Sequence, residues 1–147
     1  MNPDWPLWIK KSLVKHFKAH FGESPAIKMF VEGEYRDTQF DKEFVEVRFD
    51  GPAVSHEPSN FYRLTITVNV LLSTTMDGDT YRHHRLAGRV LNGFTKRIPF
   101  FGEGEDAIEC LQLKSKVRFN YFGQIDTVLK IEQSTVDADY TLSLAGS

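Results

Sequence analysis

The stretch FYRLTITVNVLLST, residues 61–74, decides the fold class because its apolar and polar side chains alternate. One face of an extended strand would carry Tyr62, Leu64, Ile66, Val68, Val70 and Leu72, and the other Arg63, Thr65, Thr67, Asn69 and Leu71. This pattern predicts an antiparallel strand with one face in the core and one in water. A strand of up to 14 residues is long against the usual ~5–6. We therefore expect it to extend beyond its own core or to pair with another copy.

Two segments before this stretch are also predicted to be strands. Residues 43–50 (EFVEVRFD) alternate in the same way. Gly51-Pro52 is expected to end that strand and to open a protruding loop as far as residue 60. Residues 27–33 are a weaker strand candidate.

The C-terminal third is predicted to supply the rest of the sheet. Residues 98–106 are expected to form a short connection. Strands follow at 107–121, with a break near Ser115, at 127–133 and at 136–144. Residues 133–135 are expected to form a turn or a bulge between the last two.

Two segments have helical periodicity. Residues 4–21 begin with Asp4 as a cap and Pro6 in the first turn. The apolar stripe of this helix is Trp5, Ile9, Leu13, Phe17 and Phe21, and Lys10, Lys11, Lys15 and Lys18 fall on its other face. Residues 80–92 form the second helix, ended by Gly93. Its expected buried stripe is Leu86, Val90, Leu91 and Phe94, with Ala87 and Gly88 permitting close packing.

These segments predict one α+β domain over residues 1–147, an antiparallel β-sheet with two α-helices packed on it in the order α-β-β-β-α-β-β. The length of 147 residues suits a single domain, and the 41% of hydrophobic residues can fill one core.

Composition excludes several classes of protein. A net charge of −2 argues against a general nucleic-acid binder, which is usually basic. A single cysteine excludes an intramolecular disulfide and CxxC zinc sites. No apolar run approaches 18 residues, so we expect no membrane span. The polar, acidic start does not follow the order of a signal peptide, and a reducing compartment is expected.

Catalytic and metal motifs are weak, so we assign no catalytic residue, no metal ligand and no cofactor. His16 and His20 have a spacing that can bind metal, but they lack further ligands and indicate a solvated pair. His83 and His84 are adjacent and point apart on a helix, and one of them is a candidate pH-sensitive contact. Cys110 is expected to be a small core residue. A Cys–His nucleophile pair stays formally open.

Charge is distributed in blocks of opposite sign, which suits head-to-tail self-association. Residues 81–97 hold five bases and no acid, and residues 98–109 hold four acids and no base. Arg82, Arg85 and Arg89 form one basic ridge at helical spacing. The spacing of Asp37, Asp41 and Glu43 does not match the EF-hand pattern, so we assign no Ca²⁺ or Mg²⁺ site to these residues. We assign both sets to subunit contacts. Head-to-tail contacts can close into a ring, and we assign the acidic loop with Glu103, Glu105 and Asp106 to the lumen of that ring.

Four strings occur in an order that resembles siphophage tail terminators, which are small tail-completion or minor tail proteins of the phage virion. They are FVEVRFDGP (44–52), NFYRLTITVNVLL (60–72), YFGQID (121–126) and EQSTVDADYTLSL (132–144), with a helix between the second and the third. The resemblance spans about two-thirds of the chain, residues 43 to 144. It carries no catalytic signature and no functional residue that can be matched here.

The resemblance implies a structural, non-enzymatic protein assembled in the host cytoplasm. Copies form a ring, typically a hexamer, on the end of the tail tube at the head–tail junction. The ring stops addition of the tube protein and presents a docking surface for the head connector or stopper. DNA passes through the lumen without specific binding, because acidic loops repel its phosphates.

Two other classes of protein stay open on the sequence alone. One is a head-completion or head–tail connector protein of the neck, which has a similar sheet but different neighbours. The other is a small enzyme that uses Cys110 and a histidine. The order of elements favours the tail or neck over the enzyme.

Overall fold

A single α+β domain is observed, as the sequence predicts. The computed structural model describes residues 3–23, 26–37, 41–56, 61–75, 79–126, 128 and 130–145. The elements in chain order are α1 (Trp5–Gly22), β1 (Met29–Val31), β2 (Phe44–His56), β3 (Phe61–Thr75), α2 (Arg82–Gly93), β4 (Arg97–Phe101), β5 (Ala107–Leu113), β6 (Arg118–Asp126) and β7 (Ile131–Ala145). Four strands therefore follow α2 in the described part of the chain.

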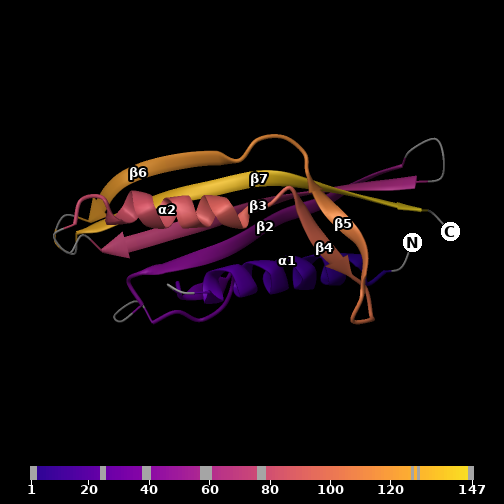
Figure 1. Ribbon diagram of the computed structural model, residues 1–147, viewed down its shortest axis with the longest axis horizontal. Coiled ribbons are helices and arrows are strands. Elements are labelled where there is room, and N and C mark those ends of the chain that lie inside the picture. Colours follow the sequence, from indigo (N-terminus) through magenta and orange to yellow (C-terminus); the bar gives the residue numbers. More distant parts are fainter. Residues whose placement is uncertain are drawn as a thin grey trace.

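The strands form one curled sheet in the order β1-β2-β3-β7-β5-β4, with β6 also paired to β7 (Figure 1). The pair β1–β2 is parallel, and every other described pair is antiparallel. The outer edge of β7 is shared, because β6 pairs with residues 131–137 and β5 with residues 140–141. The sheet thus divides at β7, and β5 and β4 curl towards α1 (Figure 1).

Strand β3 lies in the centre of the sheet. Its predicted inner face is buried from Leu64 to Leu72 and packs in one core with residues of both helices. The far ends of β2, β3 and β7 project past the helices, as expected for so long a strand (Figure 1). Pairing of β3 with another copy is excluded, because β2 and β7 occupy its two edges almost from end to end.

The expected end of β2 at Gly51-Pro52 is wrong. The strand continues to His56, and its register with β3 shifts between Asp50 and Ala53. Gly51 has φ +107° at this shift, a conformation that glycine adopts without a steric penalty. An irregularity of this kind accommodates a proline that lacks the N–H for regular pairing. Of the predicted loop, residues 57–60 lie outside the described residues.

Two further predictions in the C-terminal third are also wrong. Residues 98–101 form most of β4 rather than a connection, and Ile98 and Phe100 are fully buried. Pro99 is tolerated because β5 is the only described neighbour of β4. Residues 133–135 contain no turn, since β7 runs unbroken against β3, but a register irregularity between β6 and β7 does lie at residues 133–134. The predicted break near Ser115 is confirmed by the interval between β5 and β6.

Both helices are confirmed within two residues of their predicted bounds. The five apolar residues of the α1 stripe are buried, and its four lysines are exposed. Asp4 occupies the N-cap position but makes no capping hydrogen bond with its side chain. In α2 the buried face includes His83 and Ala87, while Leu86 and Leu91 are half-buried. A β-carbon on Gly88 would meet nothing within 4 Å, so this glycine is not needed for close packing.

A small second core explains the apolar Leu71 on the otherwise polar face of β3. Leu71 packs with Phe30 and Phe44 to form a buried cluster separate from the main core. The guanidinium of Arg36 lies 3.8 Å from the centre of the Phe44 ring and covers one side of it. Residues 29–36 thereby cover this end of the second face of the sheet.

Replacing Gly51 by alanine is expected to lower the free energy of unfolding by about 2 kcal/mol. The new β-carbon would stand 3.1 Å from both the Ala53 nitrogen and the Thr65 oxygen, at a positive φ. Urea denaturation of Gly51→Ala measures the loss. Gly104→Ala is the matched control, because its β-carbon would meet nothing within 4 Å. Equal midpoints for the two variants would contradict the expected strain.

Candidate functional site

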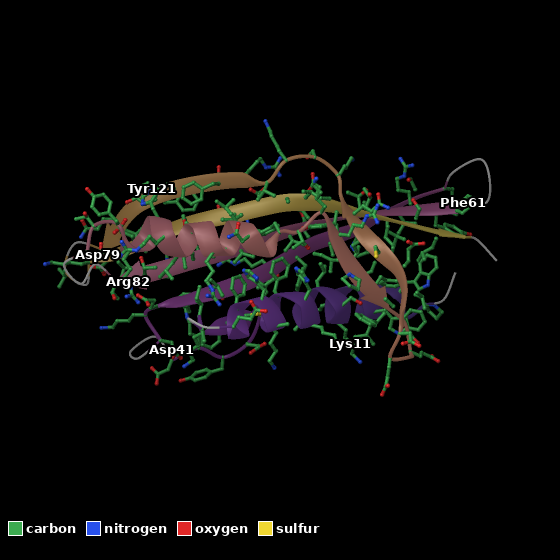
Figure 2. All side chains as sticks on the ribbon, in the orientation of Figure 1. Lys11, Asp41, Phe61, Asp79, Arg82 and Tyr121 are labelled. Atoms are coloured by element: carbon green, nitrogen blue, oxygen red, sulfur yellow. The ribbon has the colours of Figure 1, made fainter. Side chains whose placement is uncertain are left out.

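A basic groove of about 1100 Å³ runs between the end of α1, residues 26–28 and α2. The predicted ridge of Arg82, Arg85 and Arg89 lines it, together with Lys28. The sequence prediction that the three arginines share one face is therefore confirmed. Figure 2 shows Arg82, Asp79 and Asp41 together at one end of the molecule.

The two outer arginines of the ridge are paired within the chain. Arg82 binds Glu43, with 3.1 Å between its Nε and Glu43 Oε2. Arg85 binds Asp79, which also accepts a hydrogen bond of 2.9 Å from the backbone N–H of Tyr81. That backbone hydrogen bond and the nearby Arg85 guanidinium lower the pKa of the Asp79 carboxyl. These pairs are exposed, so each contributes little to stability.

Arg89 differs from the other two because it holds the helices together. Its guanidinium donates to the backbone oxygens of His20, at 3.2 Å, and of Glu23. Both carbonyls lie at the end of α1, where the His20 oxygen also accepts a long hydrogen bond of 3.4 Å from the Glu23 N–H. The Nε of Arg89 is buried and has no hydrogen-bond partner among the described residues.

The other predicted interface residues lie beside the groove. The Asp41 carboxylate pairs with Lys28 and accepts a hydrogen bond of 3.0 Å from the backbone N–H of Asp37. The hydrogen bond from Lys28 lowers the pKa of Asp41. Asp37 and Asp41 are thus brought together, while Glu43 is directed to Arg82 instead. In the described ranges no three His, Cys, Asp or Glu side chains gather in a way that suits a metal ion.

The acidic turn consists of residues 103–106, between β4 and β5. Glu103, Glu105 and Asp106 are all exposed, and none of them forms an ion pair with a described residue. The preceding Gly102 lies against the ring of Trp8 in the first half of α1. The turn therefore lies near the start of α1 (Figure 1), whereas His20 and Glu23 at the end of α1 line the basic groove.

His16 and His20 are not the solvated pair expected from the sequence. Their Nε2 atoms lie 2.8 Å from the Gly93 oxygen and 2.7 Å from the Arg89 oxygen, in the last turn of α2. Both rings thus satisfy carbonyls at the end of a helix. Burial lowers the pKa of His16. A β-carbon on Gly93 would come within 2.9 Å of the His20 ring, so glycine is required for this close approach.

A buried polar cluster around His83 was missed by the sequence analysis. His83 Nδ1 lies 2.6 Å from the Thr74 hydroxyl, and Nε2 lies 2.9 Å from the Ser134 hydroxyl. Next to it, Tyr121 donates a hydrogen bond of 2.5 Å to Glu132, which raises the pKa of the Tyr121 phenol. His83 and Ser134 are at most 1% exposed, so the cluster joins α2, β3, β6 and β7 instead of facing a substrate cavity.

Cys110 is half-buried on β5 and is therefore not the core residue that was expected. A shallow depression beside it is lined by Arg63, Glu109, Gln112, Leu113, Lys114, Thr141 and Ser143. No histidine belongs to that lining, so the depression does not supply the imidazole that a Cys–His pair needs.

The outer edge of β6 is open, because β7 is the only described strand that pairs with β6. Apolar side chains gather along this strand and the turn after it. Phe122 is 58% exposed, Ile125 54% and Val128 86%, with Phe119 and Tyr121 also exposed. Native proteins usually shorten, charge or cover such an edge, since it is a template for pairing with another chain. We call this surface the β6 edge.

Comparison with known proteins supports the fold alone. No family profile matches the chain, and no curated protein matches it. A solved structure known only by a sequence identifier is similar, with a TM-score of 0.63 and 11% sequence identity over 97% of this chain and 98% of the other. Within the described residues, no helix is long and apolar enough to span a membrane.

We predict that protonation of His83 destabilises the fold. Burial lowers its pKa, although the nearby Glu132 acts in the opposite direction. The unfolded chain, with a histidine pKa of about 6.5, therefore binds the proton first. The free energy of unfolding is then highest above that pH and falls as the pH drops through the native pKa of His83. His83→Gln should weaken the loss between about pH 7 and pH 5.

The exposed neighbour supplies a control for this measurement. His84→Gln should weaken the pH dependence of unfolding less than His83→Gln does, because the charge of His84 is only the smaller of the two causes that lower the His83 pKa. His16 contributes in the same direction and remains in both variants. An unchanged slope in His83→Gln would show that His83 is not the group being titrated.

Proposed function

We propose that this chain is a ring-forming tail terminator of a siphophage. Copies close into a ring, typically six-fold, on the end of the tail tube at the head–tail junction. The ring stops addition of tube protein and offers its other side to the head connector or stopper protein. DNA passes through the ring without specific binding.

The β6 edge is the observation that carries the proposal. A strand of nine residues, Arg118–Asp126, leaves its outer backbone groups without a strand partner and surrounds them with exposed apolar side chains. Exposed apolar surface of this kind marks a contact with another protein. The contact requires no catalytic group, and its apolar character suits a permanent attachment. We assign the β6 edge to the tube protein.

The arrangement of the resembling strings adds support. FVEVRFDGP lies in β2, residues 61–72 lie in β3, YFGQID lies in β6 and EQSTVDADYTLSL lies in β7. These four strands are consecutive neighbours in the sheet, in the order β2-β3-β7-β6. The resemblance therefore covers one continuous surface that ends at the open edge. The order of the four strings in the sequence does not by itself require their strands to be neighbours in the sheet.

Binding to tail tubes tests the function directly. Labelled chain is mixed with tubes polymerised from siphophage tail-tube proteins, and electron microscopy locates the label. We expect label at one end of each tube and no further growth when tube protein is added. Binding to tailless heads in place of tube ends would favour the neck protein. Binding to neither would contradict the tail and neck functions together.

A charged substitution in the β6 edge tests its assignment to the tube. Phe122→Lys is expected to abolish binding to tube ends, because it places an unpaired charge in an apolar contact. It should change the free energy of unfolding by only about 0.5 kcal/mol, since the residue is exposed. Leu7→Lys on α1 is the matched control, because Leu7 is similarly exposed at 49%. Loss of self-association in Phe122→Lys would instead assign the edge to a second copy.

A further inference from the structure

We propose that the acidic turn of one copy inserts into the basic groove of the next copy, and that this contact closes the ring. The inference rests on the proposed function, because it names the surfaces by which the subunits meet. The occupant of the groove is a second copy of this chain.

The groove keeps unused capacity to bind carboxylates. Lys28, Arg82, Arg85 and Arg89 line it together with only two acids, Glu23 and Glu43. The paired side chains of Lys28, Arg82 and Arg85 are still 59%, 46% and 65% exposed. A guanidinium has five N–H donors, and one carboxylate accepts only some of them. The Arg85 guanidinium can therefore bind a second carboxylate without losing Asp79, which turns an isolated pair into a network.

The acidic turn has the complementary character. Three carboxylates stand within four residues, and no cation of the described chain pairs with any of them. All three are exposed at the end of the hairpin formed by β4 and β5. The exposed cations of the groove, Lys28, Arg82 and Arg85, each pair with a carboxylate of their own chain, whereas the turn carries three carboxylates that pair with no described cation. Such matched surfaces orient two copies and exclude other orientations.

The geometry prevents a chain from filling its own groove. The turn follows Gly102, which lies against Trp8, whereas the groove is lined by His20 and Glu23 at the other end of α1. A helix rises 1.5 Å per residue, so the two surfaces lie about 20 Å apart along α1. They can therefore meet only between copies. A contact between two different surfaces at opposite ends is heterologous, and it produces a ring when the rotation closes.

Both surfaces have room for the contact. A β-carbon on Gly88, in the lining of the groove, or on Gly104, in the turn, would meet nothing within 4 Å.

The three acids of the turn, Glu103, Glu105 and Asp106, were expected from the sequence to face the lumen. The docking assigns them to the contact between subunits instead, where their charge meets arginine rather than DNA.

Cross-linking tests the contact without altering its charges. Two variants are made on a Cys110→Ser background, one with Gly88→Cys and the other with Gly104→Cys, and they are mixed with a short bismaleimide. We expect a cross-linked heterodimer from the mixture and none from either variant alone. Ser115→Cys replaces Gly88→Cys in the matched control, because Ser115 is exposed outside the groove. No heterodimer up to the solubility limit, or equal yield with the control, would overturn the docking.

A charge exchange tests the electrostatic part of the proposal. Arg85→Glu reverses charge in the groove, and Glu103→Lys combined with Glu105→Lys reverses it in the turn. Each variant alone should associate roughly ten-fold or more weakly than the parent chain. An equal mixture should recover association, because each reversed surface then meets its complement on the other variant. Association that neither falls with the single variants nor recovers in the mixture would contradict the docking.

The outcomes separate this inference from the proposed function. If rings form without a cross-link between positions 88 and 104, the proposed docking is wrong, while the proposed function as a ring-forming terminator still holds. A cross-linked heterodimer with no binding to tail tubes would support the docking and contradict the terminator. Circular dichroism of each variant shows that the chain is folded before association is measured.

Discussion

The pairing of β3 along both edges is the constraint on which the rest of the structure depends. Its inner face supplies the centre of the core, and its neighbours fix the positions of all other strands. On one side, β2 carries the short parallel β1. On the other side, β7 divides its outer edge between β6 and β5. The division produces two different surfaces, because one branch curls with β4 over α1 while the other ends as the open β6 edge.

The groove results from the way in which the two helices hold each other. His16 and His20 of α1 bind carbonyl oxygens in the last turn of α2, and Arg89 of α2 binds carbonyl oxygens at the end of α1. Each helix end thus receives partners from the other helix. This reciprocal contact fixes the helix pair and leaves Arg82 and Arg85 along its open side. The acidic turn is fixed by a separate contact with Trp8, so the two charged surfaces are built independently.

Sequence periodicity predicted β3, α1 and α2 because each is long and one face is buried continuously. It failed where a residue type that usually ends a strand lies within a segment that pairs with a neighbouring strand. Gly51-Pro52 usually ends a strand, yet the long match between β2 and β3 outweighs it. Short β4 contains a proline, and β7 contains the buried polar Ser134, whose hydroxyl is paired with His83. The basic ridge followed from helical spacing. The pairing of Arg82 with Glu43 and of His83 with Ser134 did not, because those partners are 39 and 51 residues away.

The position of β7 in the sheet has a consequence for the order in which the chain can fold. This strand follows all the other described strands in sequence, yet it is the strand that joins β3 to β6 and β5. A nascent chain still without residues 131–145 can pair β2 with β3, but it cannot bring β4 and β5 onto α1 through the sheet. Folding must therefore wait for contacts between distant residues, which slows it. Synthesis of this chain thus completes the sheet in one late step, and a chain that stops before residue 131 leaves β3, β5 and β6 without the strand that joins them.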